Sequence, residues 1–137
     1  MNYWLLKSEP SSYSWTDLAR AGRATWDGVR NHQAANNLKA MKQGDRAFFY
    51  HSGEERAVVG TVEIVKPAFP DPSDPTGRFV AVEVAALAPA PSPATLAQIK
   101  AAPALKGLAL LKQSRLSVVP VGAAEWRAIC RLAGLAP

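Results

Sequence analysis

Apolar side chains recur along the chain in two patterns, the first of which alternates with polar residues and predicts strands. Residues 2–8 (NYWLLKS) are rich in aromatic and branched side chains and stop before Pro10, which has no backbone N–H for a strand ladder. They predict a first strand whose end carries Lys7 and Ser8 on opposite faces. Four further runs predict strands, at residues 45–52, 56–65, 78–87 and 115–121.

The connections between these predicted strands are short or rich in proline. Residues 53–55 (Gly-Glu-Glu) separate the second and third strands, which predicts an antiparallel hairpin. Two other segments, residues 66–77 with four prolines and residues 88–94, break the strand pattern. Because proline removes ladder hydrogen bonds, both proline-rich segments are predicted to be loops.

The second pattern repeats every three to four residues and predicts helices. A capping-box sequence that begins at Ser14 predicts a helix over residues 14–22, and Asn31 is a suitable N-cap for a helix over residues 31–44. Between them, WDGVRN (residues 26–31) is predicted to form an irregular turn. Other helices are predicted at residues 94–101, near 107–111 and over 122–135.

These elements predict one α+β domain that covers residues 1–137. A chain of 137 residues is long enough to bury a single core. The strands follow one another too closely for crossover connections, which favours antiparallel pairing. We therefore expect a small, mixed, largely antiparallel β-barrel of about five strands with peripheral helices.

Composition narrows the class of partner. The formal net charge is +5 and the pI is near 9.7, a balance that favours polyanions, although the charges are spread along the chain. One cysteine and two histidines offer too few ligands for a disulfide or a structural zinc site, so we expect no metal, no cofactor and a reducing compartment. The N-terminus resembles neither a secretory signal nor a membrane span, and we expect a cytoplasmic monomer.

Most of the unusual side chains lie in residues 25–52, which raises the question of catalysis. Ser52, His51 and Asp27 supply the residue types of a Ser/His/Asp arrangement, yet the chain has no G-x-S-x-G, H-E-x-x-H or glycine-rich phosphate motif. A histidine at a strand end is usually a hydrogen-bonded structural residue. Glu54 and Glu55 are expected to be solvated at a hairpin tip.

Trp26 has no periodic partner that would place it on a helix or strand face. A tryptophan presented from a loop with Arg30 nearby suits stacking on a planar ring, and a tryptophan that plugs the end of a barrel is the other interpretation. If their strands are neighbours, Ser8, Tyr50 and Ser52 would meet near Trp26. Three further side chains are expected in the core, namely Trp15, Trp126 and Cys130.

Three blocks of sequence carry a resemblance to a known family. They are WLLKSEP (residues 4–10), the segment from WDGVRN to FFYHS (residues 26–52) and QSRLSVVPV (residues 113–121). Their order and content resemble the EVE domain, over essentially the whole chain. The positions that match the family's motifs are Lys7, Ser8, Trp26, Val29, Arg30, Asn31, Tyr50, His51, Ser52 and Arg115.

The resemblance implies a fold similar to the PUA superfamily, which includes the YTH readers of methylated adenine, and a pocket for a flipped-out modified base. An aromatic platform such as Trp26 would offset part of the cost of unstacking that base. Hydrogen bonds from Asn31, Ser8 or a backbone amide would read its Watson–Crick edge, and the fit of Val29 would discriminate a methyl group.

Three functions therefore stand side by side. The first is a non-enzymatic module that binds a modified base in DNA or RNA. The second is an enzyme that acts on a modified nucleotide with Asp27 or His51 as the base, although the sequence offers no nucleophile, base and orienting group together. The third is a protein-interaction or small-molecule module, for which binding would not depend on salt.

Overall fold

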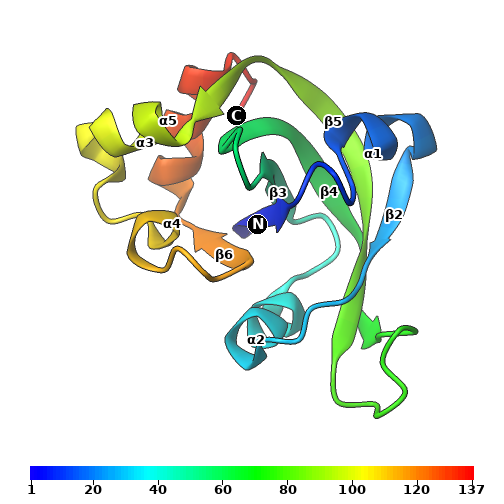
Figure 1. The fold of residues 1–137 in the computed structure, drawn as a ribbon. Helices are drawn as coiled ribbons and strands as arrows, with labels where there is room; N and C mark the ends of the chain where they lie inside the picture. The colour runs from blue at the N-terminus through cyan, green and yellow to red at the C-terminus, as the bar shows by residue number, and fades with distance from the viewer.

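The protein is built around a single six-stranded sheet (Figure 1). The structure is a computed structural model that describes residues 1–137. The strands are β1 (Tyr3–Ser8), β2 (Arg23–Trp26), β3 (Arg46–His51), β4 (Ala57–Pro70), β5 (Val80–Thr95) and β6 (Val118–Val121). The helices are α1 (Trp15–Ala21), α2 (His32–Ala40), α3 (Leu96–Ala101), the 3-10 helix η1 (Pro103–Leu105), α4 (Ala109–Lys112) and α5 (Ala123–Ala133).

The strand order is β2-β5-β4-β3-β1-β6. Only β1 and β3 pair in parallel, and every other neighbouring pair is antiparallel, so the predicted α+β class with a largely antiparallel sheet is correct. The order has two ends, β2 and β6, and the sheet is not closed. The expected barrel of about five strands is thus not confirmed: the structure has an open sheet of six.

The sixth strand is β2, which the sequence pattern did not predict. The strand has only four residues, too few to show an alternation of apolar and polar side chains, and the turn-forming Asp27-Gly28 follows immediately. The strand forms because it pairs antiparallel with β5, where Trp26 is the partner of Val82. Trp26 therefore ends a strand and does not begin an irregular turn, which corrects the prediction for this segment.

The proline-rich segments are largely strand, which corrects the prediction of two loops. β4 continues to Pro70, and β5 continues through residues 88–94 to Thr95. Along β5 the prolines recur at every second position, at Pro89, Pro91 and Pro93, and all three are exposed. Because alternate residues point their N–H groups to the same edge, only one edge of the strand loses donors there.

The core packs between the sheet and α5. The Trp126 ring lies between two other rings, with centroids 4.5 Å from Tyr3 and 3.9 Å from Phe48. Cys130 lies in the same core, where burial raises the pKa of its thiol to about 11 against the opposing effect of Arg46. Trp126 and Cys130 are core residues, as expected, whereas Trp15 is half-buried at the edge of the core, with its ring against Phe49.

Two predicted caps are present. Ser14 and Asp17 form a capping box at the start of α1, and the Asn31 carboxamide accepts the Ala34 N–H at 2.9 Å at the start of α2. α2 ends at Ala40, earlier than predicted, because the next free N–H, from Lys42, is taken by a carboxylate of the following turn at 2.9 Å. No helix of the structure has the length and apolar character needed to cross a bilayer.

Candidate functional site: a pocket beside β2

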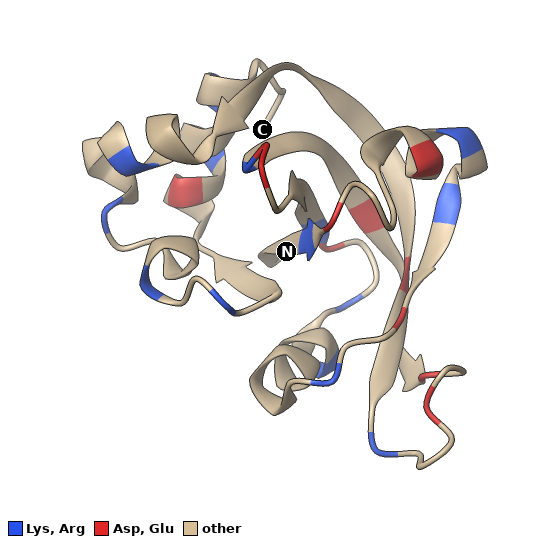
Figure 2. Ribbon diagram, viewed as in Figure 1, with Lys and Arg blue, Asp and Glu red and all other residues tan.

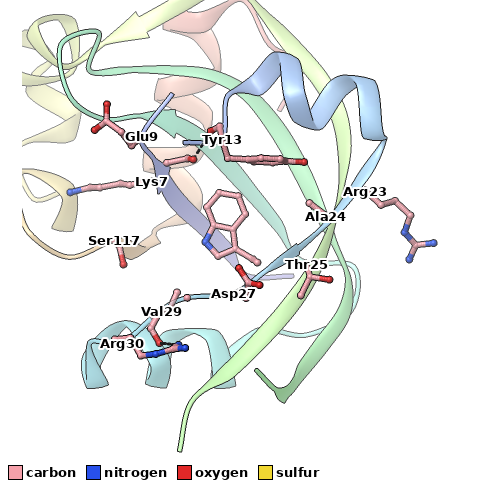
Figure 3. A pocket seen from close by; sticks show the side chains of 13 residues that line it. Lys7, Glu9, Tyr13, Arg23, Ala24, Thr25, Asp27, Val29, Arg30 and Ser117 are labelled. Atoms are coloured by element: carbon pink, nitrogen blue, oxygen red, sulfur yellow. Dashed lines mark hydrogen bonds between the residues drawn. The ribbon is translucent and has the colours of Figure 1, made fainter. Parts of the chain in front are cut away.

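A pocket of about 640 Å³ opens where the end of β1 approaches β2 and the segment before β6 (Figure 3). This volume falls in the range of about 300–1,000 Å³ that is typical of sites for small ligands. Of the ten residues predicted for the site, five line it, namely Lys7, Ser8, Trp26, Val29 and Arg30. Asp27, which the sequence analysis named only as a candidate base, also lines it, and the residues that sequence reasoning missed are Glu9, Tyr13, Arg23, Ala24, Thr25, Gly28 and Ser117.

Trp26 is the aromatic wall of this pocket. Its indole packs edge-on against Phe49 of β3, with ring centroids 5.6 Å apart and planes at 88°. The Trp26 side chain is only half-buried by this contact, and the residue lines the pocket. The two interpretations of Trp26 are therefore compatible, because one part of the ring packs in the core while the other remains available to a ligand.

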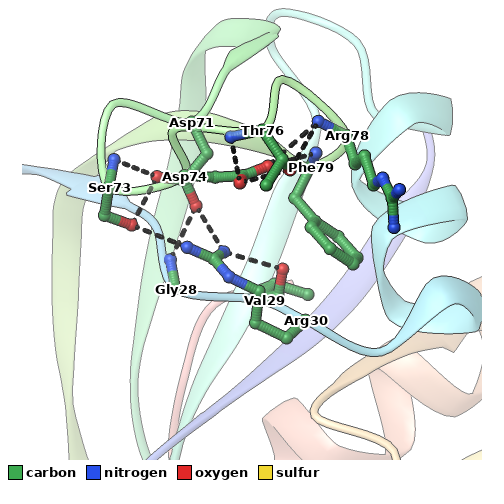
Figure 4. Close-up of polar contacts among 9 residues, drawn as sticks. All are labelled: Gly28, Val29, Arg30, Asp71, Ser73, Asp74, Thr76, Arg78 and Phe79. Carbon is green, nitrogen blue, oxygen red and sulfur yellow. Dashed lines mark hydrogen bonds and ion pairs between the residues drawn. The ribbon is translucent and has the colours of Figure 1, made fainter.

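The wall that follows Trp26 is fixed by a carboxylate from the loop between β4 and β5 (Figure 4). Buried Asp71 accepts the Gly28 N–H at 2.8 Å, pairs with the Arg30 guanidinium at 3.0 Å, and accepts the N–H and O–H of Ser73 at 2.7 and 2.6 Å. Burial by itself would raise the pKa of Asp71, but the hydrogen bonds from Ser73, Arg30 and Gly28 outweigh it and lower the pKa to about 2.

The opposite wall carries the end of β1. The Lys7 ammonium donates to the Ser114 carbonyl at 2.8 Å, and burial lowers its pKa. The Ser8 hydroxyl donates to the Tyr13 carbonyl at 2.6 Å. Ser8 therefore positions the loop after β1, and its hydroxyl oxygen remains an acceptor toward the pocket.

Tyr50, His51 and Ser52 do not line the pocket, although β3 is the parallel neighbour of β1. Tyr50 is buried within the sheet, where burial raises the pKa of its phenol against the opposing effect of Arg56. Ser52 lies 3.4 Å from the Glu9 carboxylate. Neighbouring strands thus do not bring these three side chains to Trp26.

His51 makes hydrogen bonds within the protein, which agrees with the structural interpretation of a strand-end histidine, although the family motif had placed it among the site positions. Its Nε2 accepts the backbone N–H of Trp15 at 3.0 Å, and its Nδ1 faces Glu55 Oε1 at 2.6 Å. The first contact requires an Nε2 without a hydrogen, so Nδ1 carries the ring N–H and donates a hydrogen bond to Glu55. Both ring nitrogens are therefore engaged, and the imidazole links the start of α1 to β3. Glu55 is exposed in the β3–β4 turn, as expected, and its carboxylate also pairs with His51.

Replacing His51 with alanine is expected to lower the free energy of unfolding by about 1–2 kcal/mol, because the first N–H of α1 loses its partner. The pocket residues are untouched, so binding at the site should change by less than twofold. Chemical denaturation and a binding titration of the folded variant check the two parts. A loss of binding without a loss of stability would contradict the structural role.

Asn31 and Arg115 also lie outside the pocket. The Asn31 side chain is occupied as the N-cap of α2, so it does not read a ligand edge in this arrangement. Arg115 is exposed in the connection between α4 and β6, and Ser117, two residues further along, lines the pocket in its place. No local signal in the sequence distinguishes these two positions.

The pocket is polar and of mixed charge. Lys7, Arg23 and Arg30 line it together with Glu9 and Asp27 (Figure 3). Over the whole molecule, Lys and Arg residues are spread across many elements (Figure 2). Arg23 is paired with Glu83 of β5 at 2.7 Å. No group of three or more His, Cys, Asp or Glu residues is placed to hold a metal ion.

Comparison with known proteins identifies the family. The model of the EVE domain matches residues 2–132. The chain belongs to the EVE domain family. Among curated relatives of this EVE domain, thymocyte nuclear protein 1 of Mus musculus is 50% identical over 82 residues, which make up 51% of the chain and 36% of that protein. The match thus spans about a third of the length of that relative.

Solved structures show the same fold along the whole EVE domain. The NMR structure of Rpa0253 from Rhodopseudomonas palustris is 49% identical, has a TM-score of 0.93, and covers 98% of this chain and 94% of its own. Human THYN1, crystallised in complex with 5-methylcytosine-containing DNA, is 32% identical with a TM-score of 0.90 and complete coverage of both chains.

A more distant likeness concerns the fold alone. The YTH domain of the Zygosaccharomyces rouxii MRB1 protein, solved in complex with N6-methyladenosine RNA, has a TM-score of 0.58 at 16% identity. It covers 96% of this EVE domain and 85% of its own chain. The expected likeness to the YTH fold thus holds at the level of architecture.

Proposed function

We propose that this EVE domain is a non-enzymatic module that takes a flipped-out modified base of DNA or RNA into the pocket beside Trp26. The observation that carries the proposal is the half-buried Trp26 ring, held by Phe49 in a pocket of about 640 Å³. The complex of human THYN1 with 5-methylcytosine-containing DNA supports it, because that protein matches this chain over its full length.

The energetics of such a site are balanced. Extruding a base from a duplex costs a few kcal/mol, and an aromatic platform contributes about 1–3 kcal/mol per stacked base. A methyl group that fits an apolar pocket adds about 1–3 kcal/mol. The formal net charge of +5 provides a contribution that does not depend on sequence. Selectivity for the modified base would therefore be real but limited.

The arrangement of titratable groups supports binding without catalysis. Both nitrogens of His51 are engaged in structural contacts, and His51 does not line the pocket that contains Asp27. No nucleophile, base and orienting residue lie together there. We also propose a cytoplasmic location, for which the single buried, unpaired Cys130 is the supporting feature, and a monomeric state.

The experiment that tests the proposal is a titration of short DNA and RNA oligonucleotides, each with one modified cytosine or adenine, against unmodified strands at two salt concentrations. A higher affinity for the modified strand than for the unmodified strand, at both salt concentrations, supports a base-reading pocket. Equal binding to every strand that falls steeply with salt would reduce the interaction to phosphate contacts. Turnover of a modified nucleotide in the same mixtures would favour the enzymatic alternative.

A further inference from the structure

We infer that the Asp27 carboxylate makes the pocket selective for bases with an exocyclic amino group over bases with a keto group at the same position. This inference rests on the proposed function, because it specifies what the same pocket reads. The carboxylate lies directly after the Trp26 platform and lines the pocket. It would therefore face the edge of a base stacked on that ring.

The cationic groups of the pocket are already engaged within the protein. The Lys7 ammonium donates to a carbonyl, Arg23 is paired with Glu83, and Arg30 is held by Asp71. The second pocket carboxylate, Glu9, lies beside the β3–β4 turn, where its Oε1 is 2.6 Å from the position that a Cβ on Gly53 would occupy. The side chains left without a hydrogen bond are Tyr13, Thr25, Asp27, Ser117 and the indole N–H of Trp26.

Among these free groups, Asp27 alone can only accept a hydrogen bond, whereas the Trp26 indole N–H can only donate one. The hydroxyls of Tyr13, Thr25 and Ser117 rotate to donate or accept, so they adapt to either kind of base edge. A carboxylate only accepts, and it repels a carbonyl oxygen. Figure 3 shows Asp27 and Thr25 on one side of the pocket and Lys7 and Ser117 on the other. A base between them presents different edges to the two sides.

The backbone of Asp27 is held on both sides. Before it, Trp26 is paired with Val82 in the β2–β5 ladder. After it, the Gly28 N–H donates to buried Asp71 at 2.8 Å, and Gly28 has a φ of 76°, a conformation that glycine adopts without strain. The exposed carboxylate thus extends from a fixed stretch of main chain, as discrimination between two base edges requires.

Base chemistry then sets the preference. Cytosine presents its N4 amino group as a donor, which is the group that Asp and Glu side chains accept from in DNA complexes. Thymine carries the same 5-methyl group as 5-methylcytosine but presents the O4 acceptor in place of the amino group. If thymine occupied the site, its O4 atom and the Asp27 carboxylate would be two acceptors facing each other. Thymine should therefore bind more weakly than 5-methylcytosine.

The test compares single-stranded DNA with 5-methylcytosine, cytosine or thymine at one central position, titrated against the full chain and its Asp27→Asn variant. We expect the full chain to prefer 5-methylcytosine over thymine by about 5- to 150-fold, the ratio that corresponds to 1–3 kcal/mol for a specific base contact. Asparagine both donates and accepts, so the variant should bind the two bases within about threefold of each other.

Glu54→Gln is the matched control, because it removes the same unit of charge from an exposed carboxylate in the β3–β4 turn, outside the pocket. The control should keep the full preference, and any general gain in affinity for the polyanion should be equal in both variants. Methylation-dependent binding with an unchanged ratio in Asp27→Asn, or equal binding of both bases by the full chain, would overturn the inference alone. Equal binding of 5-methylcytosine, cytosine and thymine by the full chain overturns the inference, and it overturns the proposed function as well only if the wider panel of modified DNA and RNA strands also shows no dependence on modification.

Discussion

Replacing Trp26 with alanine is expected to weaken binding of the preferred modified oligonucleotide by about 5- to 150-fold, which corresponds to the 1–3 kcal/mol that an aromatic platform contributes per stacked base. Binding of unmodified strands should change much less, because phosphate contacts do not involve this ring. The measurement is a fluorescence anisotropy titration of both strands at one salt concentration. For Trp26→Ala, the titration curves of the modified and the unmodified strand should converge.

Trp15 provides a matched control for the loss of core packing. Its indole, from α1, also packs edge-on against Phe49, with centroids 5.6 Å apart and planes at 74°, but it does not line the pocket. Trp15→Ala should therefore destabilise the fold at least as much as Trp26→Ala and still discriminate the modified strand. Trp26→Phe, which keeps a ring at the pocket, should retain part of the preference. Equal loss in both alanine variants would mean that Phe49 packing, and not stacking, controls binding.

The elements that were predicted well are those whose signals are local. The capping box at Ser14 and the cap at Asn31 depend on residues three positions apart, and both helices begin where these signals place them. β2 and the strand extensions of β4 and β5 were missed because their stability comes from pairing between distant segments. Proline at every second position of β5 is compatible with a strand, whereas an isolated proline in a central strand would not be.

The site shows the same division between local and distant signals. The family motifs place Trp26, Val29 and Arg30 at the pocket, and these residues are close in sequence. Ser117 was missed because it reaches the pocket through the pairing of β6 with β1, which no local pattern reveals. His51 was named as a site residue and instead supports α1, because its motif is equally compatible with a ligand contact and with a buried hydrogen bond.

Asp71 was also missed, and its replacement by asparagine has the second large expected effect. Every group that reaches this carboxylate is a donor: the N–H groups of Gly28 and Ser73, the Ser73 hydroxyl and the Arg30 guanidinium. In either orientation of an asparagine side chain, its NH2 group, which only donates, would face some of these donors. We expect Asp71→Asn to lower the free energy of unfolding at neutral pH by about 2–3 kcal/mol.

The pH dependence of this difference follows from the lowered pKa of Asp71. A carboxyl whose pKa falls from 3.8 in the unfolded chain to about 2 in the folded protein stabilises the fold fully above pH 4, by about 2 kcal/mol. That contribution decreases as the pH falls from about 4 to about 2, because protons then bind the unfolded chain more readily. The stability difference between the parent and Asp71→Asn should shrink over this interval, as measured by urea unfolding at each pH. A difference that stays constant from pH 6 to pH 2 would contradict the assigned pKa.

Asp74 separates the effect on the pocket from an effect on the loop. Its carboxylate accepts only from its own turn, from Thr76, Arg78 and Phe79, and makes no contact with Gly28 or Arg30. Asp74→Asn should therefore perturb the β4–β5 loop and leave binding unchanged. Asp71→Asn frees the wall that carries Gly28 and Arg30, so it should also weaken binding of the modified strand by several-fold at neutral pH, where the variant is still folded. Equal binding by the two variants would mean that the pocket keeps its shape without the Asp71 contacts.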